Sequence, residues 1–370
     1  MIGTTSKKAI LEKLKDFKVD DSYQSLFSKD KVLSELDTLC LSYMCKLTNE
    51  VYLEKGITDI GAILKTLEKT PLAKLVNFFI TILHKNNFIS ISIASSISLT
   101  DKVKNVSTDE LDAKFKTLSP EYSGILDLIK YSYANYPKVL SGEKAGLNVL
   151  FPDGTHSFTH EKLNLQSAIF SNAGSLKSVI IEVLQALRKE IKIIEVGGGA
   201  GEFTWSILEK LGYTPCEYMF TDIGRAFIIS AKKKAANLQY NFMKFHVYDI
   251  TKQPEQDFFE QYDTVLAYNV VHATKNISES LKNIRSLLKP KGVLILIEVY
   301  APFLWQHFVW GMLEGMWYFD DKYRENTATL ALPLWDKALQ EAKFEELFVF
   351  PQGTQSYNND TGIMVYQKLD

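Results

Sequence analysis

The sequence predicts an α/β fold, in which a mainly parallel sheet carries helices on both faces and follows a mostly helical region. A short apolar strand runs into a glycine-rich turn and then a helix near residue 200. After that turn, strand-like and helix-like segments alternate to the end of the chain, whereas the first half shows mostly helical spacing of apolar residues. We therefore expect a helical region over 1–185 and a sheet domain over 186–370.

The glycine-rich turn is the strongest local signal. Residues 191–196 read IKIIEV, a β-branched run that is typical of a buried parallel strand, and the helix is expected over 203–211. Strand, glycine turn and helix form the first unit of a nucleotide-binding sheet, because glycine lets the backbone approach a ligand closely. A plain tight turn is the alternative interpretation. The glycines concerned are Gly197, Gly198, Gly199 and Gly201.

Three details favour S-adenosylmethionine over a dinucleotide as the ligand of this turn. The dinucleotide pattern G-x-G-x-x-G fails, because Glu202 or Thr204 occupies its third glycine position. Glu195 ends the strand, where its carboxylate would repel a pyrophosphate but suit the cationic methionine end of the cofactor. Asp222 ends the next strand about 20 residues later, the spacing expected of a ribose-hydroxyl acceptor, although a helix N-cap is its alternative role.

The elements after the turn alternate as a doubly wound sheet requires. Further strands are expected at 218–221, 242–247, 264–268, 293–299, 346–350 and 363–367. Helices are expected at 226–236, 277–288, 302–318 and 334–342. Ligands of such sheets lie at the carboxyl ends of the strands. The polar residues at or just past those ends are Glu195, Asp222, Asp249, Asn269 and Glu298.

A histidine and a glutamate are the candidate catalytic residues. His272 follows the strand 264–268, and Glu298 lies at the end of the strand 293–299. If these two strands are neighbours, the carboxylate fixes the imidazole tautomer and raises its basicity, which leaves a base for a substrate proton. Such a base serves a carbon or a hydroxyl nucleophile. A turn histidine bonded to backbone and a charge at a strand end are the structural alternatives.

Composition excludes several function classes. A formal net charge of −2 on 370 residues predicts no nucleic-acid partner. The three cysteines form no metal or redox motif, which favours a reducing, cytoplasmic location. No signal-peptide core or membrane-span run of about 20 apolar residues is present. We expect no metal, because His156 and His160, although four residues apart, have no third ligand nearby.

The first half reads as a winged-helix-like module followed by a lid. Helical spacing is expected over 32–53, 62–67, 72–83 and most of 105–145, with a strand at 89–93 and Pro137 stopping the last helical run or beginning another. The apolar patch 146–151 ends in a Pro-Asp-Gly turn. Residues 162–187 are again helical and are placed to exclude water from the site. A docking or covering role suits this region better than DNA binding, since it lacks a basic stripe.

These motifs together resemble the S-adenosylmethionine-dependent C-methyltransferase domains of polyketide synthases. The likeness covers roughly residues 32–370, and NVVHATKNI with the following LLKPKG and LIE is its most specific part. Other matching stretches include IIEVGGGAGEFT (193–204), YMFTDIGRAF (218–227) and GMLEGMWYFDDKYR (311–324). The resemblance implies a class I methyltransferase fold, with a Rossmann-like sheet and an N-terminal lid or docking domain.

The resemblance also implies roles for individual residues. His272 and Glu298 match the catalytic pair of the family, and the substrate is a β-ketoacyl chain on an acyl carrier protein, methylated at its α-carbon. The implied S-adenosylmethionine ligands are Glu195, Gly197, Gly199, Gly201, Asp222, Asp249, Ile250 and Asn269. A family lid tyrosine has no clear counterpart, although Phe170 falls in that area. Without a carrier, ketosynthase or acyltransferase segment, the chain is expected to be an excised domain or a freestanding enzyme.

Three rival functions stay open on the sequence. An O-methyltransferase of a small hydroxylated metabolite would use the same histidine base, and the atom that carries the added methyl separates the two. A non-catalytic module with a degenerate site is a second rival, which S-adenosylmethionine calorimetry would test. DNA binding by residues 30–100 is the weakest, and it would require salt-sensitive binding of duplex DNA.

Overall fold

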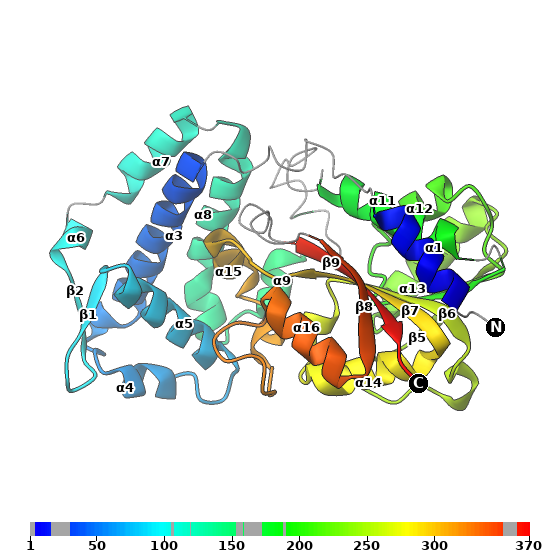
Figure 1. Ribbon diagram of the computed structural model, residues 1–370. Helices are drawn as coiled ribbons and strands as arrows, with labels where there is room; N and C mark the ends of the chain where they lie inside the picture. The colour runs from blue at the N-terminus through cyan, green and yellow to red at the C-terminus, as the bar shows by residue number, and fades with distance from the viewer. Residues whose placement is uncertain are drawn as a thin grey trace.

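The computed structural model places a helical region beside a sheet domain (Figure 1). It describes residues 4–15, 30–104, 107–118, 120–152, 158, 172–187, 190–350 and 361–370. None of the helices within these ranges is long and apolar enough to cross a bilayer. Both termini lie on the sheet side of the molecule (Figure 1).

The sheet has seven strands in the order β5-β4-β3-β6-β7-β9-β8. β3 to β7 run parallel, and β9 pairs antiparallel with both β7 and β8. The mainly parallel, doubly wound sheet predicted from the sequence is therefore confirmed. The strands are β3 (Lys192–Val196), β4 (Glu217–Asp222), β5 (Met243–Val247), β6 (Tyr262–Tyr268), β7 (Leu288–Val299), β8 (Phe344–Phe350) and β9 (Thr361–Lys368).

Apolar cores lie on both faces of this sheet, as its continuous β-branched strands require. Successive residues of one strand point to opposite faces, so Ile193 packs into one core and Ile194 into the other. The first core is covered by α1 (Thr4–Leu14), α11 (Asn172–Ala186), α12 (Thr204–Lys210) and α13 (Arg225–Asn237). The second is covered by α14 (Ile277–Leu287) and α16 (Leu332–Glu341).

The helical region has its own apolar core, built around α3 (Asp30–Val51), α5 (Leu72–Lys85) and α8 (Ser123–Leu140). A two-stranded hairpin of β1 (Ile89–Ile91) and β2 (Ile97–Leu99) extends from α5 (Figure 1). The smaller helices are α4 (Ile60–Lys65), α6 (Asp101–Lys104), α7 (Thr108–Leu118), α9 (Gly146–Leu150) and the 3-10 turns η1 (Leu53–Lys55) and η2 (Pro120–Tyr122).

Packing crosses residue 185, where the sequence predicts the domain boundary. Ile10 and Leu14 of α1 lie in the core of the sheet domain, next to α11. Conversely, α15 (Leu304–Trp310) follows β7 but buries Trp305 and Phe308 in the core of the helical region. Each part of the molecule therefore receives a helix from the other part of the chain, and the boundary at 185 stays a prediction.

Several expected elements differ in detail. Pro137 neither stops nor starts a helix, because α8 continues through it to Leu140 and the Pro137 carbonyl still accepts the Ser141 N–H at 3.1 Å. The helix expected over 302–318 is broken at Gly311, and only α15 and the 3-10 turn η5 (Glu314–Trp317) form there. A Cβ at Gly311 would lie 2.2 Å from the His307 carbonyl oxygen and 2.8 Å from Leu75 of α5, so the preceding turn and the packing of α15 against α5 both favour glycine here.

Two short elements of the first half were not predicted from the spacing of apolar residues. β2 has only three residues, and α9 has only five, which is too short for a helical period to be read. Of the predicted lid 162–187, the structure describes α11, and residues 162–171 lie outside the described residues, as do Phe170, His156 and His160.

Candidate active site

The glycine turn after β3 is held in a left-handed backbone conformation. Gly197, Gly199 and Gly201 have φ angles of 65°, 53° and 76°. A Cβ at Gly197 would lie 2.4 Å from Val270, so this turn packs directly against the loop that follows β6. The contact falls where β3 separates β4 from β6, the point of the sheet at which nucleotide ligands bind.

Asp222 ties the end of β4 to this turn. Its Oδ2 accepts the Gly199 N–H at 2.9 Å, and its Oδ1 accepts the Gly224 N–H at 2.7 Å. Each carboxylate oxygen keeps a second acceptor site. The side chain can therefore still accept a ribose hydroxyl. Its bond to the N–H of Gly224, which precedes α13, resembles the helix N-cap role considered as the alternative.

Glu195 lies at the end of β3, where the sequence predicts it. Its carboxylate is buried and accepts hydrogen bonds from the hydroxyls of Thr204 (2.5 Å) and Tyr218 (2.8 Å). Burial raises the pKa of Glu195 to about 7, although the two hydroxyl donors lower it and the Asp222 charge raises it further. The carboxylate thus joins β3 to α12 and β4 through its Oε2, and its contact with the cationic end of the cofactor stays a prediction.

The remaining predicted cofactor residues lie at the same edge of the sheet. Asp249 bonds to its own turn, where it accepts the Thr251 N–H at 3.0 Å and the Thr251 hydroxyl at 2.7 Å, and Ile250 is buried. Asn269 adopts a φ of 48°, and its Oδ1 accepts the Val299 N–H at 3.1 Å. Asn269 therefore fixes the spacing between the ends of β6 and β7.

His272 and Glu298 are in direct contact. β6 and β7 are neighbouring parallel strands, with Tyr268 opposite Ile297, and His272 lies in the 3-10 turn η4 (Val271–Ala273) just past β6. The His272 Nδ1 is hydrogen-bonded to Glu298 Oε2. Glu298 Oε1 accepts the N–H groups of Val271 at 2.8 Å and His272 at 3.3 Å. The carboxylate is fully buried, whereas the imidazole keeps 11% of its surface exposed.

This contact orients the ring in a way that suits a general base. Because Glu298 accepts at Nδ1, the neutral imidazole carries its proton there, and Nε2 is left with a free lone pair. The geometry that the sequence predicts for the pair is present, and its catalytic role stays a prediction.

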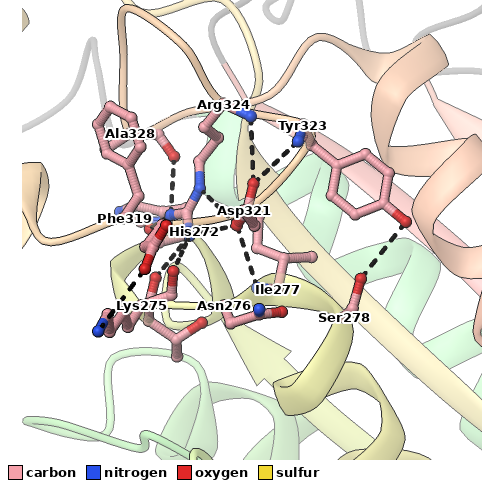
Figure 2. Close-up of polar contacts among 12 residues, drawn as sticks. His272, Lys275, Asn276, Ile277, Ser278, Phe319, Asp321, Tyr323, Arg324 and Ala328 are labelled. Atoms are coloured by element: carbon pink, nitrogen blue, oxygen red, sulfur yellow. Dashed lines mark hydrogen bonds and ion pairs between the residues drawn. The ribbon is translucent and has the colours of Figure 1, made fainter.

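A buried ion pair beside the histidine was missed by the sequence argument. Figure 2 shows Arg324 and Asp321 on the segment after η5, directed toward the loop 272–277. The Arg324 guanidinium donates to the His272 carbonyl at 2.5 Å and to Asp321. The two residues lie three apart in an irregular segment, so no periodicity marks them as buried, and charged residues are mostly exposed.

The residues at this edge fit S-adenosylmethionine. A Cβ built on Gly199 meets no atom within 4 Å, so its missing side chain leaves open space at the turn. Asp222 retains acceptor capacity beside that space, and Ile250 offers an apolar contact after β5. Gly197 and Gly201 could not carry a side chain without displacing Val270 or Trp205, so the turn is built for close backbone approach.

Sheet order and glycine turn together define the class I methyltransferase fold. Residues 194–294 match the family model described as a methyltransferase domain. Within the described residues, this stretch holds the glycine turn, Asp222 and His272, and it ends inside β7 four residues before Glu298 (298 − 294). The predicted fold class is therefore confirmed.

The similar proteins include polyketide synthases, a carbon methyltransferase and a trans-methyltransferase. The non-reducing polyketide synthase mapC of Penicillium brevicompactum is 34% identical over 244 residues, 64% of this chain but 10% of that protein. The crystal structure of the CurJ carbon methyltransferase aligns over 98% of this chain and 99% of its own, with a TM-score of 0.79 and 24% identity. The trans-methyltransferase CalH, solved in complex with SAH, aligns over 92% and 91%, with a TM-score of 0.66 and 24% identity.

These comparisons confirm the resemblance to polyketide synthase C-methyltransferase domains. The chain spans about a tenth of the length of the curated relatives it matches. The CurJ structure, in contrast, matches from end to end, helical region included.

Proposed function

We propose that this chain is an S-adenosylmethionine-dependent C-methyltransferase that methylates the α-carbon of a β-ketoacyl thioester on an acyl carrier protein. The observation that carries the proposal is the His272–Glu298 pair, in which His272 lies on the loop that contacts the glycine turn and Glu298 lies on β7. The resemblance to polyketide synthase domains supports the substrate class, and the SAH bound to CalH supports the cofactor, since SAH is S-adenosylmethionine without its methyl group.

The described residues divide the work of the reaction. The Nε2 of His272 takes the proton from the α-carbon, which is acidified by its two neighbouring carbonyl groups. Glu298 keeps the imidazole in the required tautomer and stabilises the imidazolium that forms. The cofactor, when bound, supplies an electrophilic methyl group. The glycine turn, Asp222 and Ile250 would hold the cofactor near the loop that carries His272, where orientation of the two reactants lowers the barrier.

The decisive experiment incubates the chain with methyl-labelled S-adenosylmethionine and a panel of β-ketoacyl carrier proteins and free β-ketoacyl thioesters. We expect the label on the α-carbon of at least one substrate, located by mass fragmentation, and faster transfer to the carrier-bound chain. Small hydroxylated metabolites are assayed alongside, and label on the oxygen of one of them would instead support the O-methyltransferase. Absence of transfer, together with S-adenosylmethionine binding in calorimetry, would identify a non-catalytic module.

The acyl carrier protein and the cytoplasmic location belong to the proposal. A freestanding enzyme would methylate a carrier supplied in trans, whereas an excised domain would prefer the carrier of its own synthase. Rates measured with carriers from several synthases, all loaded with one acyl chain, distinguish the two cases.

A further inference from the structure

The segment between η5 and α16 packs against the loop that carries His272. Its two central charged side chains are almost inaccessible, with 1% of the Arg324 side chain and 2% of the Asp321 side chain exposed. Burying a guanidinium is costly unless its donors are all satisfied. The acceptors that it finds therefore indicate what this arginine holds in place.

The guanidinium donors of Arg324 are directed at three carbonyls of the histidine loop (Figure 2). Nη1 donates to the His272 carbonyl at 2.5 Å, and Nη2 donates to the carbonyls of Thr274 at 2.7 Å and Lys275 at 3.1 Å. The planar fork of arginine matches such a set of acceptors, whereas a lysine ammonium has three donors around a single nitrogen.

Asp321 holds both the arginine and the far end of the same loop. Its Oδ2 accepts from Arg324 Nε at 3.0 Å and Nη2 at 2.6 Å, and it also accepts the Ile277 N–H at 3.2 Å at the start of α14. The Asp321 Oδ1 accepts the N–H groups of Tyr323 and Arg324. The pair thus fixes the loop 272–277 at its first carbonyl and at its last N–H.

The helical region reaches this network through Phe319. Lys74 of α5 donates to the Phe319 carbonyl, and its Nζ lies 3.9 Å from the centre of the Phe319 ring. The guanidinium carbon of Arg324 lies 5.2 Å from the centre of the same ring. The backbone beside Arg324 is therefore anchored on the helical region as well as on the sheet domain.

From this geometry we propose that Arg324, oriented by Asp321, is a positioning residue for the base His272; the proposal rests on the proposed function of that histidine. Glu298 holds the ring Nδ1 and the backbone N–H of His272, and Arg324 holds the carbonyl of the same residue. Because the N–H, the carbonyl and the ring Nδ1 of His272 are all held by hydrogen bonds, the ring Nε2 is confined to one position. A displacement of about 1 Å in such a group costs up to about 100-fold in rate.

The test compares Arg324→Lys, Arg324→Ala and Asp321→Asn with the control Arg285→Lys. Arg285 lies on α14 and donates to the Leu369 carbonyl near the C-terminus. The first readout is the imidazole ¹⁵N spectrum of the cofactor-free chain, in which His272 is assigned among six histidines by its loss in His272→Ala. It reports the ring tautomer and needs no catalytic activity.

We expect the wild type and Arg285→Lys to show one sharp signal of an Nδ1-protonated ring for His272. The three site variants should show a shifted or broadened His272 signal, because the ring is then no longer held in one position against Glu298. The second readout is methyl transfer, where kcat should fall about 10- to 100-fold in the site variants. S-adenosylmethionine affinity should change less than about threefold, since Arg324 contacts none of the predicted cofactor residues.

Arg324→Lys decides the case if Arg324→Ala fails to fold. An unchanged His272 spectrum in Arg324→Lys and Asp321→Asn would overturn the proposal, and so would a kcat within twofold of the wild type. If the wild type transfers no methyl to any substrate, the proposed function fails and the ring spectra alone decide whether Arg324 positions His272. If the site variants lost S-adenosylmethionine affinity and kcat equally, in proportion to their fall in melting temperature, Arg324 would have a purely structural role and the proposal would be wrong.

Discussion

Glu298→Gln is the sharpest test of the base. The carboxylate has two jobs, since Oε1 accepts the N–H groups of Val271 and His272 and Oε2 accepts from the imidazole. Glutamine has one acceptor oxygen and one NH₂ group, so it cannot do both. If the NH₂ faced the two backbone N–H groups, each buried N–H without an acceptor would cost about 1–3 kcal/mol.

The amide oxygen should therefore take the Oε1 position and leave the NH₂ group facing His272 Nδ1. The ring nitrogen must then accept, which moves the imidazole proton to Nε2 and removes the lone pair that abstracts the substrate proton. A wrong histidine tautomer with otherwise intact geometry costs on the order of 10³- to 10⁴-fold in kcat. Stability should change little, because every backbone N–H keeps its acceptor.

The assay is transfer of labelled methyl to a β-ketoacyl thioester, with S-adenosylmethionine affinity measured by calorimetry on the same samples. Glu217→Gln is the matched control. Glu217 is a buried glutamate at the start of β4 in the same sheet, and it forms an ion pair with Lys244 of β5. We expect affinity to be kept in both variants and turnover to be lost only in Glu298→Gln. Turnover above a tenth of the wild-type value would refute the tautomer argument.

Three further predictions test the rest of the site. His272→Ala should abolish methyl transfer and leave S-adenosylmethionine affinity within about threefold of the wild type, as measured by calorimetry; residual turnover would exclude His272 as the base. Gly197→Ala should lower the melting temperature more than Gly199→Ala. Both residues have a positive φ, which costs an alanine about 1–2 kcal/mol at either position, but only the Cβ at Gly197 collides with Val270. Equal shifts in melting temperature would contradict this packing. Glu195→Gln should flatten the pH dependence of unfolding in urea between pH 5 and 8.

The sign of the pH effect follows from burial. Burial raises the folded-state pKa of Glu195 to about 7 from its ordinary value of 4.5, so the folded protein binds the proton more tightly. The contribution of Glu195 to the free energy of unfolding is fully present below the unfolded-state pKa and is lost as the pH rises through about 7. The loss amounts to on the order of 3 kcal/mol in all. Wild-type unfolding free energy should therefore fall across this window more than that of Glu195→Gln. An equal slope in both proteins would exclude Glu195 as its source.

Local patterns predicted the elements that lie in the sheet domain. The β-branched runs and glycine turn marked β3 and its neighbours, and the predicted strand ends agree with the structure within a few residues. Such strands are buried on both faces, so their apolar character is continuous and visible in sequence. The helix boundary predicted at Pro137 and the helix predicted over 302–318 were wrong in detail, since helix ends there depend on packing between α5, α8 and α15.

Contacts between distant segments were beyond local patterns. The adjacency of β6 and β7 could be expected from their order, which is why the His272–Glu298 pair was predicted. The bonds of Glu195 to Thr204 and Tyr218 could not, because they depend on which way a strand-end carboxylate points.

The sequence by itself determined the class of sheet, the glycine turn and the contact between His272 and Glu298, because these depend on periodicity and strand order. Only the tertiary structure decided that α1 and α15 each pack across the predicted boundary, and that Arg324 reaches the His272 carbonyl from 52 residues away in the chain. The physical reason is that a buried guanidinium is stable only where hydrogen-bond acceptors surround it in space. The positions of those acceptors produce no periodic pattern in the sequence.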